Sequence, residues 1–545
     1  MNRLPALLAV AIAAAPAAAA EWPAVPDQAI RAHVEFLADD LLEGRAAGSP
    51  GYDLAARYVA SQMRAIGLEP AGDGGGWLQS VPLIEAKRDL GAGTLAVRGT
   101  GGSDDRLTPI EDFIPGFFFG ATDSAVTAPA TYAGFGIHAP ELGHDDFAGI
   151  DLKGRIAVVL DGAPAGFPDS QRAHYSGRAK TEELVARGAI GIVTVDTPQE
   201  EARVPWERKK NLSWNPRMRL LDEAGVPVDA YPEIKASASV SLAAAPRLFA
   251  GAAMSAADAF AAATERRSRS FELPGEISVS VRNSLARAQS ANVIGLLRGS
   301  DPALAGEYVV LTAHLDHLGR GTAFDGDDLY NGALDNAAGI SILIETARAL
   351  AASPTRPRRS ILFIALTAEE RGLLGAYHFT AHPTVPRESL VANINTDMPE
   401  ALFPVAGMIL LGAPHTTLGY RAREALAAEG LVEVPDPTPE EVSFVRSDQY
   451  PFIRSGIPAI VVRPGAMSSD PAVDARAVQR QFRLNHYHMP SDTIALPIHW
   501  PSLAKQAQVT VRLALAIAND DAAPAWLPGD FFGKTFGATR RADGG

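Results

Sequence analysis

The sequence predicts an α/β fold with a mostly parallel central sheet covered by helices on both faces. From about residue 275 onward, short apolar runs alternate with longer stretches of helical character. Alternation of this kind is typical of βαβ units, in which crossover helices cover a parallel sheet. At 545 residues the chain is long enough for a large core and more than one domain.

Composition excludes several functional classes. Apolar residues make up 47% of the chain, charged residues make up 21%, and the formal net charge is −14. These values are ordinary for a soluble globular protein. No cluster of Lys and Arg stands out in the sequence, which argues against nucleic acid as a partner. The chain has no cysteine, so any metal must be held by nitrogen and oxygen ligands.

Residues 1–20 are predicted to be a signal peptide. Arg3 precedes an Ala-rich apolar run that ends in Ala18-Ala19-Ala20 before Glu21, which fits an A-x-A cleavage site. The alternative is a short N-terminal anchor, although the run is short for a membrane span. We therefore expect an exported protein, periplasmic or extracellular, with no membrane span in the mature chain.

Two helices are predicted over residues 24–70. The apolar residues at helical spacing are Ile30, Val34, Leu37 and Leu41 in the first helix and Leu54, Tyr58 and Met63 in the second. Gly67 is a plausible C-cap for the second helix, with Pro70 beyond it.

Residues 122–270 differ from their flanks and are predicted to form a small inserted α/β domain. They contain short β runs at 155–160 and 191–195, and a helix-like stretch at 180–187. No paired acid or His cluster of catalytic type occurs there. A structural, gating or substrate-binding role is expected for this segment, which leaves residues 21–121 and 271–545 as the main domain.

The second half of the chain supplies the predicted sheet. The predicted strands are 292–297, 308–311, 360–366, 391–395, 408–411 and 459–462, and the predicted helices include 337–352 and 373–380. The tail after about residue 523 is predicted to be extended. In sheets of this class, functional sites form outside the carboxyl ends of the strands.

Acid and imidazole side chains lie at the ends of these apolar runs. They are His314-Leu-Asp316, Asp335-Asn336, Glu369-Glu370, Asp397 and His488. A metal-binding imidazole needs its second nitrogen held, and Asp316 can do this for His314. His317 is the competing ligand, and we favour His314 because it leaves the strand on the same face as Asp316.

Asp335 stands where a loop enters a predicted helix. An N-cap is the plain interpretation of such an acid, and a carboxylate bridging two cations is the alternative. The acids just upstream, Asp325, Asp327 and Asp328, lie in a Gly-flanked loop and are interpreted as solvated.

The pair Glu369-Glu370 follows an apolar strand directly. Adjacent side chains diverge, so one carboxylate can bind a metal while the other reaches metal-bound water. An exposed pair at a helix start is the alternative interpretation. The apolar strand leading straight into the pair favours a site.

Asp397 ends another strand, and His486 and His488 share a later loop. Each piece alone fits a scaffold equally well, and their joint occurrence favours a site. Nitrogen and oxygen ligands without sulfur suit two Zn²⁺ ions that share a bridging carboxylate. Co²⁺ or Mn²⁺ are possible substitutes.

These motifs resemble the co-catalytic zinc exopeptidases, the family that includes aminopeptidase Y, bacterial secreted aminopeptidases and glutamate carboxypeptidase II. The matching strings are AHLDHLG (313–319), YNGALDNAAG (330–339), ALTAEERGLLGA (365–376), NTDM (395–398), RSDQYPFIRSGIP (446–458) and YHMPSDT (487–493). The N-terminal RAAGSPG string also resembles the start of that family. The resemblance implies the three-layer αβα sandwich of phosphorylase/hydrolase-like zinc exopeptidases.

The resemblance also implies a role for each site residue. One metal would be bound by His314 and Asp397, the other by Glu370 and His488, with Asp335 bridging, Glu369 as general base and Asp316 as the partner of His314. Tyr487 would help to stabilise the oxyanion, with Tyr450 as its rival. The position four residues before an Asp-Thr pair selects His488 over His486.

The inserted segment, residues 122–270, resembles a protease-associated (PA) domain, most closely over 182–193. A role as a lid over the active site is a hypothesis. Two departures from the family bear on specificity. Gln449 stands where many relatives have His, and Asp397-Met398 is followed by Pro399-Glu400 rather than by a hydrophobic residue and Gly.

The expected function is that of an exported zinc aminopeptidase acting on peptides with a free amino terminus. A water held between the metals, deprotonated by Glu369, would attack the peptide carbonyl. A carboxypeptidase or dipeptidase on the same metal site is the alternative, with Arg446 as a clamp for the substrate carboxylate. A non-catalytic, receptor-like homologue is disfavoured because the five ligands and the base are all present.

Overall fold

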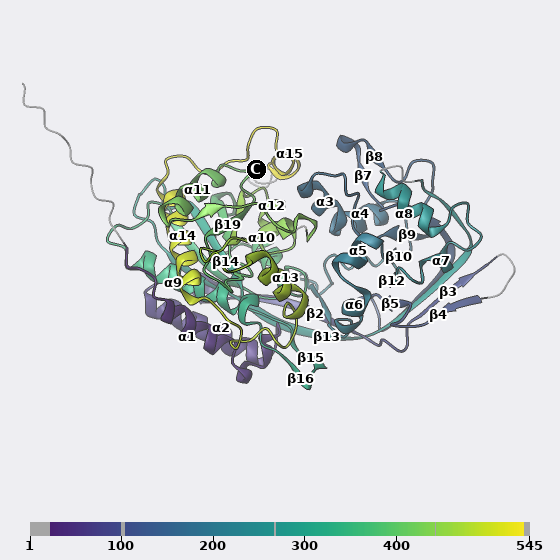
Figure 1. The fold of residues 1–545 in the computed structure, drawn as a ribbon, viewed down its shortest axis with the longest axis horizontal. Helices are drawn as coiled ribbons and strands as arrows, with labels where there is room; N and C mark the ends of the chain where they lie inside the picture. Colours follow the sequence, from purple (N-terminus) through teal and green to yellow (C-terminus); the bar gives the residue numbers. More distant parts are fainter. Residues whose placement is uncertain (1–21, 100–103, 266–268, 442, 539–545) are drawn as a thin grey trace, which may run out of the picture.

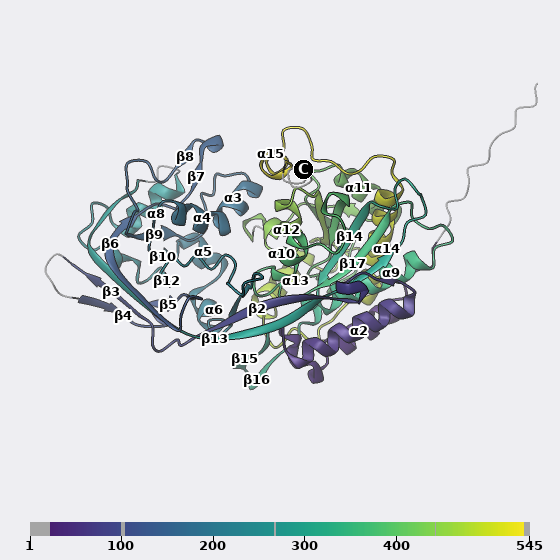
Figure 2. The same ribbon diagram turned by 180° about the vertical axis from the view of Figure 1, so that it is seen from behind.

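The computed structural model describes residues 22–99, 104–265, 269–441 and 443–538, and the chain forms two lobes side by side (Figure 1). The predicted signal peptide lies outside the described residues. The long strand β13 (Phe271–Leu297) runs along both lobes (Figure 2), and β2 (Leu78–Arg88) pairs antiparallel with its residues 283–293. β13 takes part in the sheets of both lobes and joins them.

The sheet of the first lobe has a parallel centre. Its neighbouring parallel strands are β17 (Ser360–Leu366), β14 (Tyr308–His314), β18 (Leu390–Asn395) and β21 (Ala459–Pro464). The carboxyl-terminal part of β13 pairs antiparallel with β17, and β19 (Gly407–Leu411) pairs antiparallel with β21. The predicted α/β fold with a mostly parallel sheet is confirmed, and the two antiparallel pairings add to it.

Helices cover both faces of this sheet because its strands are apolar on both sides. Val309 and Leu311 of β14 join one hydrophobic core, and Val310 between them joins another. The first core includes α1 (Asp27–Leu37), α2 (Pro50–Ile66), α9 (Ala338–Ala351), α11 (Leu418–Ala428) and α14 (Trp500–Asn519). The second includes α10 (Leu374–Ala381) and α12 (Gln449–Arg454). The result is three layers.

The N-terminal helices differ in detail from the prediction. The first ends at Leu37, and Leu41 is 82% exposed in the 3₁₀ turn that follows. In α2 the buried face is formed by Tyr52, Ala55, Ala56, Val59 and Met63, whereas Leu54 is half exposed. The small side chains of Ala55 and Ala56 let α2 lie close to β13. The prediction relied on large apolar residues and therefore did not include these alanines. Gly67 adopts the predicted left-handed C-cap conformation, with φ of 91°.

The second lobe has a sheet and a core of its own. The parallel strands are β6 (Asp123–Tyr132), β9 (Ile156–Leu160), β10 (Gly191–Val195) and β12 (Ala236–Val240). Its hydrophobic core draws on residues from Leu95 to Val281, wider on both sides than the predicted segment 122–270. From within that segment, β11 (Arg217–Leu220) adds a strand to the first lobe's sheet beside β2.

The remaining strands are short. They are β1 (Glu69–Pro70), β3 (Thr94–Arg98), β4 (Asp104–Leu107), β5 (Phe113–Pro115), β7 (His138–Ala139), β8 (His144–Asp145), β15 (Gly319–Phe324), β16 (Asp327–Tyr330) and β20 (Val432–Glu433).

The remaining helices lie in the second lobe and toward the end of the chain. They are α3 (Asp169–Ser176), α4 (Arg178–Ala186), α5 (Pro198–Arg203), α6 (Trp206–Asn211), α7 (Ala245–Leu248), α8 (Ala256–Thr264), α13 (Ala475–Asn485) and α15 (Phe531–Phe536). The tail after residue 523 was predicted to be extended, but it contains the short helix α15. Phe532 of this helix packs into a buried cluster that is rich in aromatic side chains. Within the described residues, no helix combines the length and apolar character needed to cross a membrane.

Candidate metal centre

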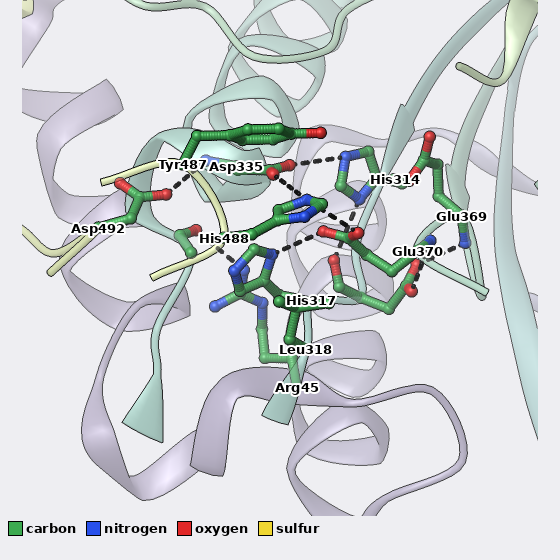
Figure 3. Close-up of polar contacts among 12 residues, drawn as sticks. Arg45, His314, His317, Leu318, Asp335, Glu369, Glu370, Tyr487, His488 and Asp492 are labelled. Atoms are coloured by element: carbon green, nitrogen blue, oxygen red, sulfur yellow. Dashed lines mark hydrogen bonds and ion pairs between the residues drawn. The ribbon is translucent and has the colours of Figure 1, made fainter. Parts of the chain in front are cut away.

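The predicted site residues converge at the carboxyl edge of the parallel strands (Figure 3). His314 is the last residue of β14, Glu369 and Glu370 follow β17, and Asp397 follows β18. Parallel pairing sets the end of β14 level with the end of β17, since His314 aligns with Leu366. The side chains therefore meet where this class of sheet forms its sites.

His314 lies between two carboxylates. Its Nε2 is 3.0 Å from Asp397 Oδ1 and 3.2 Å from Asp335 Oδ1. Its Nδ1 donates to the main-chain carbonyl oxygen of Asp316 at 3.1 Å, whereas the carboxylate of Asp316 had been expected in that role. That carboxylate instead accepts the backbone N–H of Glu369 at 3.0 Å and of Glu370 at 3.4 Å. Asp316 thus orients the imidazole and the Glu pair together.

Asp335 occupies the centre of the cluster. Its Oδ1 faces His314, and its Oδ2 is 3.2 Å from Nε2 of His488. One carboxylate that presents an oxygen to each of two imidazoles has the placement expected of a bridging ligand. The buried carboxylate of Asp492 holds this loop, because it accepts the N–H groups of Leu334 and Asp335, each at 3.0 Å. Burial raises the pKa of Asp492 to about 7.

Glu370 completes the second half of the cluster. Its Oε2 is 3.1 Å from Nε2 of His488, and its Oε1 is 2.9 Å from Nδ1 of His317. Although burial lowers the pKa of His488, the carboxylates of Glu370 and Asp335 raise it to about 9. His317 is fully buried and belongs to the same group of possible metal ligands as Asp335 and Glu370. Sequence reasoning had set His317 aside by treating His314 and His317 as competitors for one position.

Glu369 points away from Glu370 (Figure 3), as predicted for adjacent side chains. It lines a small cavity together with Asp335, Asp397, Tyr487 and His488. Burial raises the pKa of Glu369 well above its usual range, and the nearby carboxylates raise it further. A carboxyl group in this position can hold or release a proton beside the cluster.

Of the two candidate tyrosines, Tyr487 lies at the cluster. Its ring lies across that of His488, with ring centroids 3.9 Å apart, and it lines the same cavity as Glu369 (Figure 3). The hydroxyl of Tyr450 instead hydrogen-bonds Nδ1 of His174, in the second lobe, at 2.7 Å. Tyr450 lines a separate cavity of about 500 Å³ between the lobes.

The residues present fit divalent metal ions. Asp335 Oδ2, Glu370 Oε1 and both ring nitrogens of His317 are buried and form no well-aligned hydrogen bond among the described residues, although His488 and Glu370 lie 3.2 Å from Asp335 Oδ2 and 2.9 Å from His317 Nδ1. Buried acids and imidazoles this close together are costly unless a cation or a well-formed hydrogen bond compensates them. The donors are all nitrogen and oxygen, a set that suits Zn²⁺.

The N-terminal segment supports the centre through Arg45. Its buried guanidinium donates to the carbonyl oxygens of Leu315 at 3.0 Å, Asn331 at 2.6 Å and Gly332 at 3.1 Å. It therefore ties the loop after His314 to the loop before Asp335. Sequence reasoning noted Arg45 as part of a motif and did not assign this contact.

Of the nearby acids and histidines that were not predicted to be ligands, only His317 lies in the cluster. Asp325, Asp327 and Asp328 lie in the exposed β15–β16 hairpin, where Asp328 pairs with Arg320 at 2.7 Å. His486 hydrogen-bonds Ser491 at 2.9 Å.

The two positions that depart from the family lie beside the centre. Gln449 is buried in the cavity wall, accepts from Nδ2 of Asn395 at 3.0 Å and donates to the carbonyl oxygen of Phe444 at 2.8 Å. Glu400 accepts from Arg483 at 2.8 Å. Both side chains are thus held by neighbouring residues.

Comparison with known proteins finds a family model and several aminopeptidases that are similar to the part of the chain containing this site. The family model described as Peptidase family M28 matches residues 292–514, which contain every predicted metal ligand. Aminopeptidase NAALADL1 of Mus musculus is 32% identical over 168 residues, covering 30% of this chain and 20% of that protein. Aminopeptidase YwaD of Bacillus subtilis (strain 168) is 25% identical over 359 residues, covering 65% of this chain and 58% of YwaD.

The chain thus spans 20% of the length of the first relative and 58% of the length of the second. Among solved structures, the aminopeptidase from Aneurinibacillus sp. strain AM-1 has a TM-score of 0.51 and 19% identity. The match covers 93% of this chain and 97% of that one, and it shows a likeness of fold.

Proposed function

Because residues 292–514 of the chain match the model of peptidase family M28, we propose that the protein is an exported, zinc-dependent aminopeptidase that removes N-terminal residues from peptides. The placement of Asp335 carries the proposal, since its two oxygens face His314 and His488 on opposite sides. Two named aminopeptidases among the relatives support the reaction class.

Two zinc ions per chain are part of the proposal. His314 and Asp397 would hold one, Glu370 and His488 the other, and Asp335 would be shared between them. Bound zinc supplies a Lewis acid that polarises a peptide carbonyl and makes water more acidic. The contact between His317 and Glu370 would orient that carboxylate toward the second ion.

Glu369 is the proposed general base. Its carboxylate lines the cavity beside the cluster, where it would accept the proton of the attacking water. The same group would then return that proton to the nitrogen of the leaving amine. Asp316 positions it by accepting the Glu369 backbone N–H.

The hydroxyl of Tyr487 is proposed to donate a hydrogen bond to the oxyanion that forms as the carbonyl is attacked. The support is its place in the same cavity as Glu369, whereas Tyr450 is engaged with His174. Arg208 lies over the Tyr487 ring, 5.3 Å from its centroid, and restrains it from the second lobe.

The second lobe is proposed to be a protease-associated-like domain that covers one side of the centre. Support comes from its contacts with the site: Arg208 donates to the carbonyl oxygen of Tyr487 at 2.6 Å, and Asn215 accepts from the buried Arg371. Export is proposed from the signal-like residues 1–20.

A matched set of peptides tests which end of the substrate is cleaved. Ala-Ala-Ala, its N-acetylated form and its C-amidated form would be assayed with purified protein, with and without chelator. We expect acetylation to abolish cleavage, amidation to preserve it, and chelator to stop both. Cleavage of the acetylated but not the amidated peptide would instead indicate a carboxypeptidase, with Arg446 at the cavity as its clamp. Metal analysis should find about two zinc ions per chain, and a value near zero would indicate a non-catalytic homologue.

A further inference from the structure

A chamber of about 640 Å³ adjoins the candidate metal centre between the two lobes. Its wall includes α5 and α6 of the second lobe and α13 and the end of β21 of the first. The chamber and the cavity that contains Glu369 share the wall residues Arg446, Arg463, Arg483, Tyr487 and His488. A group in the chamber therefore lies next to the reacting centre.

The chamber wall is strongly basic. The arginines that line it are Arg203, Arg208, Arg446, Arg463, Arg476, Arg480 and Arg483, and the lining acids are Glu400 and Glu441. The whole chain carries a formal net charge of −14. The chamber thus has the opposite sign to the rest of the protein, and a wall of one sign draws in ligands of the other.

Some of these arginines are already paired with acids. Glu441 lies 3.2 Å from Arg203 and 2.9 Å from Arg446, and Glu400 lies 2.8 Å from Arg483. Arg203 is also held by Glu200, with Nε to Oε2 at 2.9 Å, so three carboxylates balance Arg203, Arg446 and Arg483.

The excess of positive charge comes from the other arginines, of which, among the described residues, only Arg463 is paired with an acid, Asp436 at 3.5 Å. Arg208 donates to the carbonyl oxygens of Arg483 at 2.7 Å and Tyr487 at 2.6 Å, and no ion pair joins it to a described carboxylate. Burial lowers the pKa of Arg208 and of Arg463, and the Arg483 guanidinium lowers both further, as expected for crowded positive charges.

Arg476 and Arg480 are the chamber arginines with the fewest contacts to other charged side chains. They are exposed, one turn apart on α13, and the spacing places Arg483 on the same face. Among the described side chains, neither forms an ion pair. Their guanidinium groups can reorient toward a ligand that enters the chamber.

We propose that this chamber binds carboxylate groups of the substrate, so that the protein prefers peptides that carry a carboxylate close to the scissile bond. The inference rests on the proposed peptidase function and names its substrate class. Guanidinium groups match carboxylates with paired, charge-assisted hydrogen bonds, which makes arginine suited to this recognition.

The carboxylate can come from three places in a peptide: the first side chain, the second side chain, or the free carboxyl terminus of a short peptide. Three matched pairs separate them. They are Glu-Ala-Ala-amide against Gln-Ala-Ala-amide, Ala-Glu-Ala-amide against Ala-Gln-Ala-amide, and Ala-Ala-Ala against its amide. Each pair differs in charge and little in shape, so the ratio of kcat/KM reports recognition of the carboxylate.

For the zinc-loaded, full-length protein we expect at least one pair to favour the acid by roughly tenfold at low salt, mostly through KM, and less at high salt. The variant R476Q/R480Q should reduce that ratio by about two- to tenfold. The control R57Q/R106Q removes two exposed arginines that do not line the chamber, and it should leave the ratio unchanged.

The outcomes separate the two proposals. Cleavage of the neutral peptides with no preference for any acid would overturn this inference and leave the proposed function intact. A ratio that falls equally in R476Q/R480Q and in the control would also overturn it, since net charge alone would then explain the preference. Failure to cleave any of the six peptides would overturn the peptidase proposal and this inference with it.

Discussion

The two lobes end their parallel strands in the same way, with acids, yet they neutralise those acids differently. In the first lobe, Asp397 and Glu370 face the imidazoles of His314 and His488. In the second lobe, Asp161 follows β9 and Asp196 follows β10, and both contact Nζ of Lys209, at 3.2 Å for Asp161. The partner, rather than the position at a strand end, decides whether such acids form a metal site or an ion pair.

The difference follows from the chemistry of the partner. An imidazole can release its proton and become a metal ligand, and a bound cation then balances the carboxylates, whereas an ammonium group has no lone pair to offer and only balances charge. Even so, burial raises the pKa of Asp196 to about 6, although Lys209 opposes this shift. The second cluster therefore has a structural role, and variants in the two lobes should fail in different ways.

The largest effect is expected at Glu369. E369Q keeps the shape and leaves the proposed ligands unchanged, so zinc content should stay at the wild-type level. Activity on a neutral peptide should fall by about 10²- to 10⁴-fold, because the proton acceptor is lost. Near wild-type turnover by a zinc-loaded E369Q protein would show that Glu369 is not the base.

A second test concerns metal retention at Asp335. D335N removes the shared negative charge between His314 and His488, so zinc retained after dialysis should fall from about two to one or fewer per chain. The matched control is D325N, in the exposed β15–β16 hairpin, which should retain the wild-type amount. Equal zinc in both variants would contradict the assignment of Asp335 as the bridging ligand.

The smallest effect is expected in the second lobe. K209M leaves Asp161 and Asp196 without their cation, and it should lower the free energy of unfolding by about 1–3 kcal/mol while zinc content stays the same. K210M is the neighbouring control, because Lys210 pairs with the exposed acids Glu111 and Glu207 and should matter less. Thermal unfolding of the two variants compares them directly. An equal melting temperature, or a loss of zinc in K209M, would break the contrast between the lobes.

The sequence was a good guide where short segments carry the whole signal. The strand at 360–366 has the predicted bounds, since its residues are apolar throughout and both faces are buried. The predicted ligands His314, Glu370 and Asp397 lie at or just after strand ends, because a residue that ends a parallel strand is placed by the sheet itself.

Features that depend on distant partners were not predicted. Residues 283–291 of β13 are largely polar and were not predicted as a strand, and pairing with β2 is what makes them one. α13 was missed because its buried face has only Ala475, Gln479 and Phe482, while its arginines line the chamber. His317 needs the loop after β14 to turn it toward Glu370, and no sequence spacing reveals that turn.

The basic chamber illustrates the same limit of local patterns. Arg203 and Arg208 come from one lobe and Arg463 and Arg483 from the other, so the sequence does not show that they line one chamber. Folding collects charges that are dispersed along the chain, and a search for Lys and Arg clusters in sequence does not find them.

The shared strand β13 has a mechanical consequence. A strand that is hydrogen-bonded into both sheets couples the two lobes. The pairing of β13 passes directly from β6, at Arg282, to β2, at Asn283, so swinging one lobe would bend a hydrogen-bonded strand at that point. Domain closure of the hinge type absorbs its motion in a few loop residues, which this connection does not offer. We therefore expect the gap between the lobes to keep a nearly fixed width during turnover, with access governed by the side chains that line it.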